Sequence, residues 1–133
     1  MSAGNVVDAS VVVAALVDSG TAGQWSEGVI AEGFSVAPQL VIVEALNILR
    51  RLELAKQLSE IEAAAAQQHL HELEVELMPI RPFEERIWQL RKNLSCYDAW
   101  YVAIAETMEL PLATLDQRLA RASGPLCAFR QPI

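Results

Sequence analysis

Four acidic residues are the candidates for chemistry in this chain: Asp8, Glu44, Asp98 and Asp116. The three aspartates stand where a helix is expected to begin, and the glutamate lies early in an expected helix that follows a strand. In an open α/β sheet, ligands bind at the edge formed by the carboxyl ends of the strands, and these positions fall at that edge. We therefore expect the four carboxylates to converge in one pocket.

Four carboxylates in one pocket repel one another strongly, and the arrangement is tolerable if a hard divalent cation occupies the pocket. Oxygen ligands favour Mg²⁺, with Mn²⁺ as an alternative, over zinc, which prefers His or Cys. Magnesium held by carboxylates suits phosphodiester hydrolysis, because it activates a bound water and stabilises charge on the phosphate. Nothing in the sequence resembles a phosphate-binding glycine loop, a nucleophilic cysteine with its histidine or a serine triad. Metal-dependent hydrolysis at the acidic residues is the chemistry that the sequence indicates.

Each aspartate also has a purely structural interpretation. Asp8 and Asp116 are placed to cap the helices that follow them, and Ser10 is placed to contribute to the cap of the helix after Asp8. The segment from Ser95 to Asp98 fits a capping box. Taken alone, each aspartate is more often a cap than a catalyst, so the case for chemistry depends on all four acids together.

Glu44 lies in a segment that is otherwise apolar. Glu44, Asn47 and Arg51 are spaced at i, i+3 and i+7, which puts them on one stripe of a helix. A buried carboxylate is costly unless it is paired or binds a metal. The stripe either faces water or turns Glu44 toward the pocket that contains Asp8, and position alone favours neither alternative.

Hydrophobic periodicity predicts an α/β fold in which strands and helices alternate. Strands are expected at residues 5–7, 34–37, 76–80, 112–115 and 126–129. Helices are expected at residues 9–17, 21–32, 38–54, 60–75, 82–93 and 97–108, with a last short helix from Gln117. This pattern favours a three-layer α/β/α sandwich around a short, mostly parallel sheet. With no linker-like segment, residues 1–133 are expected to form a single domain.

Two of the expected helices carry predictions about burial. The third, residues 38–54, is apolar almost all round, which predicts that most of it is buried. The fifth, residues 82–93, is expected to turn Ile87, Trp88 and Leu90 inward. The basic side of the fifth helix is either a solvated face or a rim for phosphates, and it consists of Arg86, Arg91 and Lys92.

The composition is that of a globular protein, with 53% hydrophobic and 20% charged residues. The net charge of −7 argues mildly against tight, non-specific RNA binding, although all the basic residues lie from Arg50 onward and leave room for a local basic rim. The apolar run from Val11 to Val17 is far shorter than the ~18 residues of a membrane helix, and no targeting segment is visible. Cys96 and Cys127 make neither a disulfide framework nor a metal-binding spacing. We expect a cytoplasmic protein without membrane contact.

Four segments of the chain match a known family in order and spacing. They read VVDASVVVAAL, VEALNILRR, SCYDAWYVAIAE and LATLDQRLARA, and the most specific part is the Tyr-Asp-Ala-x-Tyr piece followed by Thr-x-Asp. In these segments the chain resembles the PIN-domain ribonucleases, and more narrowly the VapC toxins of bacterial toxin–antitoxin pairs. The resemblance implies that the metal-binding and catalytic residues are Asp8, Glu44, Asp98 and Asp116. It also implies that Thr114 and Ser10 support this site by hydrogen bonding.

The resemblance implies a function beyond what the residues themselves indicate. We expect an Mg²⁺-dependent endoribonuclease toxin of a type II toxin–antitoxin system, with Mn²⁺ as an alternative ion and no organic cofactor. Its substrate is expected to be a structured RNA, tRNA or ribosomal RNA, whose cleavage inhibits translation. The expected partners are a second copy in a homodimer and a cognate VapB-type antitoxin, in a heterotetramer or larger complex. The carboxyl-terminal segment of the antitoxin is expected to lie across the acidic pocket.

Other proteins that cluster aspartates around Mg²⁺ fit the sequence less well. A receiver domain would have adjacent acids near the first strand and a lysine after the last, whereas Ala9 and Ser10 follow Asp8 here. A haloacid-dehalogenase-like phosphatase would have a second aspartate two residues after the first, at the position of Ser10. The remaining alternative is a catalytically inactive PIN-like binding module that docks RNA or a protein partner.

Overall fold

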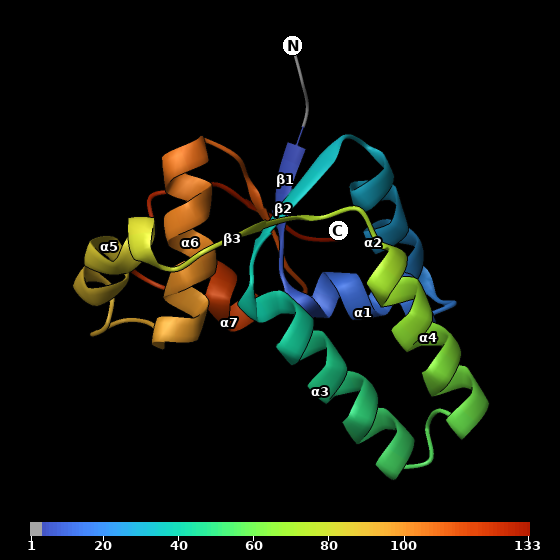
Figure 1. Cartoon of the computed structure of the whole chain (residues 1–133). Helices are drawn as coiled ribbons and strands as arrows, with labels where there is room; N and C mark the ends of the chain where they lie inside the picture. The colour runs from blue at the N-terminus through green and yellow to red at the C-terminus, as the bar shows by residue number, and fades with distance from the viewer. Residues whose placement is uncertain (1–3) are drawn as a thin grey trace.

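Five short strands form a parallel sheet at the centre of the molecule (Figure 1). The computed structural model describes residues 4–133. The sheet order is β3-β2-β1-β4-β5, and every neighbouring pair is parallel. The strands are β1 (Gly4–Val7), β2 (Phe34–Pro38), β3 (Glu76–Met78), β4 (Leu112–Ala113) and β5 (Phe129–Arg130). The predicted parallel sheet is confirmed, although the last strand begins three residues later than expected.

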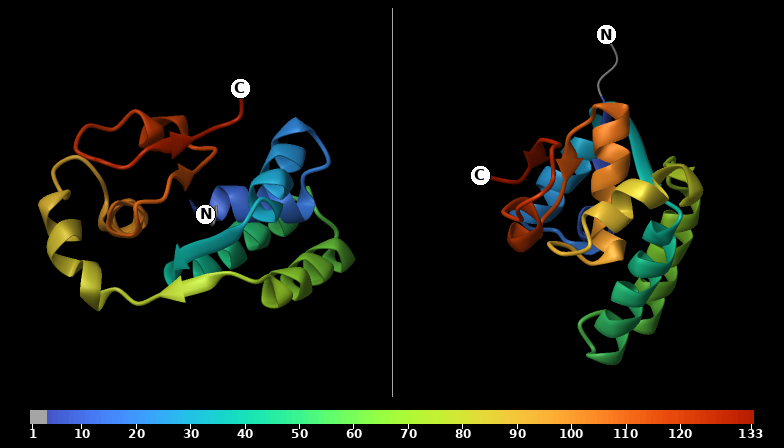
Figure 2. Two further views of the ribbon diagram at one scale, coloured as in Figure 1. Left: turned by 90° about the horizontal axis from the view of Figure 1, so that it is seen from above. Right: turned by 90° about the vertical axis from the view of Figure 1, so that its left-hand side faces the viewer.

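The helices cover both faces of this sheet and give the predicted three-layer α/β/α sandwich (Figure 2). On one side α1, α2, α3 and α4 pack against one another, and α6 packs with α5 and against β1 and β2. The helices are α1 (Ala9–Val17), α2 (Thr21–Ala31), α3 (Leu40–Leu54), α4 (Glu60–Glu72), α5 (Glu84–Gln89), α6 (Cys96–Met108) and α7 (Gln117–Ala120). A short 3₁₀ turn, η1 (Arg81–Phe83), precedes α5.

The strand order reverses direction between β1 and β4, which are neighbours in the sheet but far apart in the sequence. Val7 is paired with Ala113, so the residues that follow the two strands leave the same edge side by side. Val7 and Ala113 are fully buried, so close packing in the core fixes the ends of both strands. Such a reversal creates a crevice at the carboxyl ends of the strands. This crevice is where Asp8 and Thr114 meet.

The prediction that most of the third helix is buried was wrong. The buried residues of α3 are Val41, Ala45 and Leu49, spaced four apart on a single face, whereas Val43 and Leu54 are each 64% exposed. Figure 1 shows why: α3 runs away from the sheet, so only one face meets the core and α4. The helix also begins at Leu40, because Pro38 closes β2.

The prediction for the fifth helix was also wrong in part. The segment folds as η1 and the shorter α5, with Ile87 and Leu90 buried as expected. Trp88 instead is 63% exposed, and the guanidinium of Arg91 lies 4.2 Å from the centre of its ring. Arg86 is not a free rim cation, because its Nε donates a 2.7 Å hydrogen bond to Oε1 of Glu106. Across residues 4–133, no helix has both the length and the apolar character that a membrane crossing requires.

Candidate active site

A cavity of about 220 Å³ lies at the carboxyl edge of the sheet, where β1 and β4 end. All four acids that the sequence singled out line it, although they come from four different helices or their caps. The lining residues are Asp8, Ala9, Ser10, Glu44, Asn47, Ile48, Arg51, Asp98, Tyr101 and Asp116. The structure therefore brings together in one cavity carboxylates separated by up to 108 positions in the sequence.

Asp8 is the most deeply buried of the acids, at 7% exposure. It caps α1, since its Oδ1 accepts a 3.1 Å hydrogen bond from the backbone N–H of Val11. The hydroxyl of Ser10 donates to the same oxygen at 2.5 Å, and the hydroxyl of Thr114 donates to Oδ2. Burial raises the pKa of Asp8, and these three hydrogen bonds offset part of that increase. Asp8 thus has both the structural and the cavity-lining position that the sequence suggested.

Ser10 and Thr114 connect the start of α1 to the segment after β4. The Ser10 hydroxyl accepts a 3.1 Å hydrogen bond from the backbone N–H of Leu115. The Thr114 hydroxyl accepts a 2.9 Å hydrogen bond from the backbone N–H of Asp116. Because Thr114 also donates to Asp8, one fully buried hydroxyl links two of the acids that line the cavity.

Glu44 reaches the cavity from α3 and is held there by a residue of α6. The phenolic hydroxyl of Tyr101 donates a 2.5 Å hydrogen bond to Oε1 of Glu44. Burial raises the pKa of Glu44, the Tyr101 bond lowers it, and the charges of Asp98 and Asp8 raise it further. Burial and the Glu44 contact also raise the pKa of Tyr101 well above its usual range, so the hydroxyl remains a donor. Of the two alternatives for the polar stripe of α3, the structure therefore shows the one in which Glu44 points toward the pocket that contains Asp8.

Asp98 and Asp116 lie at the starts of the last two helices. Asp98 is the third residue of α6, and its backbone N–H donates a 3.1 Å hydrogen bond to the hydroxyl of Ser95. Burial, followed by the charge of Asp116, raises the pKa of Asp98. Asp116 caps α7, with its Oδ1 accepting from the backbone N–H groups of Arg118 at 2.9 Å and Leu119 at 3.3 Å.

Sequence reasoning missed Tyr101 as a member of the site and assigned no chemical role to Asn47 or Arg51. Tyr101 was placed on the apolar face of its helix, and it is indeed 2% exposed, but its hydroxyl reaches the cavity. The spacing of three residues between Asp98 and Tyr101 was the available signal, because such residues share one helix face. Asn47 and Arg51 follow Glu44 along the stripe, and both line the cavity.

The donor set of this cavity fits a hard divalent cation, since it offers carboxylate oxygens and no sulfur or imidazole. Three of the carboxylates, Asp8, Glu44 and Asp98, have pKa values raised by burial, and within residues 4–133 none of them forms a salt bridge. Within residues 4–133, however, no three acidic, histidine or cysteine side chains are gathered as a ready-made ion site. Mg²⁺ usually keeps several of its waters and binds through one or two carboxylates, so a compact cluster of three side chains is not required for it.

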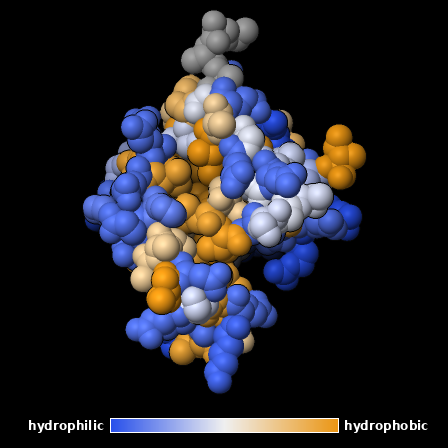
Figure 3. Space-filling model, turned by 90° about the vertical axis from the view of Figure 1, so that its right-hand side faces the viewer, coloured by the Kyte–Doolittle hydropathy of each residue, from blue (hydrophilic) through white to orange (hydrophobic). Residues whose placement is uncertain are grey.

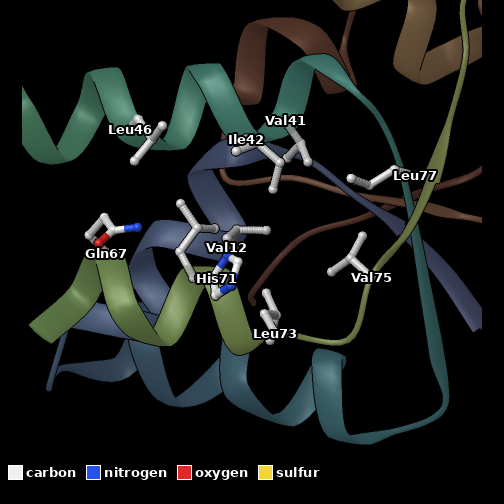
Figure 4. A pocket seen from close by; sticks show the side chains of 10 residues that line it. Val12, Val41, Ile42, Leu46, Gln67, His71, Leu73, Val75 and Leu77 are labelled. Carbon is white, nitrogen blue, oxygen red and sulfur yellow. The ribbon is translucent and has the colours of Figure 1, made fainter.

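A second hollow, of about 240 Å³, lies between α3, α4 and β3 and has a different character (Figure 4). Figure 4 shows Val12, Val41 and Ile42 pointing into it, with Leu73 and Val75 on the other wall. Gln67 and His71 are its polar lining residues, and no carboxylate lines it. Its chemistry suits apolar contacts, whereas the chemistry of the first cavity suits cations.

Comparison with known proteins identifies relatives that match most of the chain. The PIN domain family model matches residues 6–125. Ribonuclease VapC1 of Mycobacterium tuberculosis is 41% identical over 126 residues, which cover 94% of this chain and 95% of that protein.

Two solved structures have the same fold. M. tuberculosis VapC20, described as a sarcin–ricin loop cleaving toxin, has a TM-score of 0.65 at 17% identity and covers 86% of this chain and 91% of its own. VapBC2 from Rickettsia felis, bound to a DNA fragment from its promoter, has a TM-score of 0.67 at 12% identity. That match covers 98% of this chain and 99% of the other.

Proposed function

The chain belongs to the VapC ribonucleases of the PIN domain family, and from this premise we propose that it is a metal-dependent endoribonuclease toxin. The observation that carries the proposal is the convergence of Asp8, Glu44, Asp98 and Asp116 on one cavity at the switch point of the sheet. These four carboxylates would hold Mg²⁺, or Mn²⁺ in its place. A divalent ion supplies Lewis acidity, which lowers the pKa of water and stabilises charge on a phosphate.

Hydroxyl groups beside the acids hold the carboxylates in position. Ser10 and Thr114 donate hydrogen bonds to the two oxygens of Asp8, so that this buried carboxylate has a fixed orientation. Tyr101 does the same for Glu44 from the opposite helix. These contacts prepare the acids for a cation, because a carboxylate whose oxygens are already oriented loses less conformational freedom when an ion binds.

We propose a structured RNA, a tRNA or ribosomal RNA, as the substrate, and inhibition of translation as the result of its cleavage. The description of VapC20 as a sarcin–ricin loop cleaving toxin supports a ribosomal target. The net charge of −7 supports selective rather than general RNA binding, because the overall field repels nucleic acid and binding must depend on local contacts.

We also propose a VapB-type antitoxin and a second copy of the chain as protein partners. The description of the R. felis protein as VapBC2, and exposed apolar side chains of this chain, support that proposal. On the face that α2 and α4 cover, Figure 3 shows apolar side chains (orange) reaching the surface between hydrophilic ones. The exposed apolar residues of α3 include Val43, Leu46 and Leu54. Val43 and Leu46 lie one turn apart on α3, and large apolar side chains exposed side by side are typical of protein interfaces.

The proposal is tested by incubating the purified protein with total cellular RNA in Mg²⁺, in Mn²⁺ and in EDTA, and by sequencing the fragment ends. We expect a few discrete cuts in tRNA or ribosomal RNA that require the divalent ion. Cuts confined to other RNAs would contradict the proposed target, and cleavage that persists in EDTA would contradict the metal.

One observation favours a second candidate, an inactive module that binds RNA or a protein. In the described part of the chain, no three potential ligands stand close enough to form an ion site before binding. Isothermal titration with Mn²⁺ separates the two candidates. Absence of binding, together with absence of cleavage, would favour the inactive module, whereas saturable binding would favour the nuclease.

A further inference from the structure

The acidic cavity continues into a hollow that is distinct from the apolar hollow of Figure 4. We call it the flanking hollow. This hollow has a volume of about 520 Å³ and lies between α1, the start of the loop after it, α3 and the turn after α3. Ser10, Ile48 and Arg51 line both spaces. The two hollows are therefore adjacent compartments of one groove, and an extended ligand can occupy both.

Arg51 is the cation at the junction of these compartments. It lies on α3, seven residues after Glu44 and on the same stripe, and its side chain is exposed. Among residues 4–133, Arg51 has no salt bridge, whereas Arg118 has its Nε 3.9 Å from Oδ1 of Asp116. A guanidinium that no carboxylate engages is available to bind a phosphate through two parallel hydrogen bonds.

An RNA strand needs such a cation at this point. The acidic cavity presents Asp8, Glu44, Asp98 and Asp116, which repel the phosphates that precede and follow the one to be cleaved. An ion bound in the cavity offsets this repulsion for the scissile phosphate, but a neighbouring phosphate lies beyond it. Arg51 lines both the cavity and the flanking hollow, so its positive charge is available to such a neighbouring phosphate.

The lining of the flanking hollow suits a nucleoside. Val13, Val17 and Leu52 give it apolar walls, against which a base or ribose can pack. Ser19 and Gln57 supply hydroxyl and amide groups that can bind the edge of a base. The hollow therefore offers both apolar contact and polar recognition next to the acids.

Resting on the proposed ribonuclease function, we infer that the flanking hollow is a subsite for the nucleotide next to the scissile bond, with Arg51 binding its phosphate. The subsite would set the position of the cut and contribute to the choice of RNA sequence. Arg51 is a binding residue in this account, and the acids remain the site of cleavage.

The test uses a short synthetic RNA that spans a cut made by the wild-type protein in total RNA. Arg51→Ala is expected to raise KM about tenfold, the loss expected for one hydrogen-bonded charge pair, with a much smaller effect on kcat. The slope of log KM against log salt is expected to become shallower by about 0.7 for a single strand. Arg51→Lys should restore part of the affinity. The control is Arg50→Ala, at the next position of the same helix but outside both hollows, which is expected to leave KM and the salt slope unchanged.

A second variant tests the hollow itself. Ser19 is exposed after the end of α1, so Ser19→Trp adds bulk to the hollow with little effect on the core. RNAs with an abasic nucleotide on the 5′ or the 3′ side of the cut should each be compared with the intact RNA. With the wild type, we expect one of the two abasic RNAs to have a higher KM than the intact RNA. With Ser19→Trp, we expect that abasic RNA and the intact RNA to have the same KM.

Three outcomes would overturn the subsite while leaving the ribonuclease intact: an unchanged KM for Arg51→Ala, an equal loss for Arg50→Ala, or abasic penalties that Ser19→Trp does not alter. Absence of metal-dependent cleavage by the wild type would instead contradict the proposed function, and the subsite with it. Thermal melts of each variant separate these outcomes from unfolding.

Discussion

The hydroxyl of Tyr101 on α6 donates a 2.5 Å hydrogen bond to Oε1 of Glu44 on α3, and this contact joins two helices across the acidic cavity. Tyr101 is 2% exposed, so its ring is fixed by the core. Glu44 is half-buried, whereas Asn47 and Arg51, which follow it on the same stripe of α3, are exposed. The contact therefore directs the Glu44 carboxylate inward.

Tyr101→Phe removes this contact and leaves the ring in place. We expect the free energy of unfolding to fall by about 1 kcal/mol, because a half-buried carboxylate loses its donor. We also expect kcat for RNA cleavage to fall, because Glu44 is no longer oriented. Tyr97→Phe on the same helix is the control, since Tyr97 is 64% exposed. Urea denaturation and cleavage rates check both effects, and equal behaviour of the two variants would show that the contact does not position Glu44.

Thr114→Val tests the hydroxyl that links two acids. The substitution keeps the shape of the side chain but removes the donor to Asp8 and the acceptor of the Asp116 N–H. Because the site is fully buried, we expect a loss of about 1–3 kcal/mol in the free energy of unfolding. Thr114→Ser should retain most of the stability, and Thr107→Val, at an exposed position of α6, should have little effect. A Thr114→Val protein as stable as the wild type would contradict the role of this hydroxyl.

The buried acids make stability depend on pH in a defined direction. Burial raises the pKa of Asp8, so the folded state holds this proton more tightly than the unfolded state. The resulting stabilisation is fully present below the ordinary pKa of about 4 and is lost as pH rises through the raised pKa. Asp8→Asn has no such loss and retains a capping side chain.

In EDTA, the stability of Asp8→Asn relative to the wild type is therefore expected to increase as pH rises above about 4. Thr107→Val, at an exposed position of α6, changes no titratable group and should show a constant difference. Thermal melts across this range check the prediction. A relative stability of Asp8→Asn that declines with rising pH would mean that the Asp8 carboxylate is not destabilised by burial.

Divalent ions are expected to stabilise the wild-type protein without any RNA present. An ion that binds the folded state alone adds about 2.7 kcal/mol at a concentration of 100 times its Kd. We expect Mn²⁺ to raise the melting temperature of the wild type and to have little effect on Asp98→Asn, which lacks one of the four carboxylates. An equal shift for both proteins would place the ion elsewhere.

The sequence was sufficient to predict the sheet, the element order and the meeting of four acids in one cavity, because these depend on local patterns. Strand ends, helix starts and their carboxylates are adjacent along the chain, so Asp8 and Asp116 could be placed before the structure was known. Their convergence with Glu44 then followed from the geometry of a parallel sheet. The resemblance to the VapC family pointed to the same residues.

The wrong predictions concern contacts between distant segments. The apolar sequence of α3 cannot reveal that the helix extends past the sheet, which leaves Val43 and Leu54 exposed. The pairing of Arg86 with Glu106, 20 positions later, is a contact that the basic pattern of Arg86, Arg91 and Lys92 does not reveal. The hydrogen bond from Tyr101 to Glu44 spans 57 positions and was likewise invisible in local periodicity. In each case tertiary packing determines the environment of the side chain.

The most direct test of the central claim is the rate of RNA cleavage in Mg²⁺ by variants that each lack one carboxylate of the cavity. The variants are Asp8→Asn, Glu44→Gln, Asp98→Asn and Asp116→Asn. The control is Glu27→Gln, at an exposed position of α2 outside both the acidic cavity and the flanking hollow. We predict that each cavity variant loses about two orders of magnitude or more in rate, since several kcal/mol of charge stabilisation is removed. Glu27→Gln should cleave like the wild type. Cavity variants that cleave as fast as Glu27→Gln would contradict the assignment of this cavity as the active site.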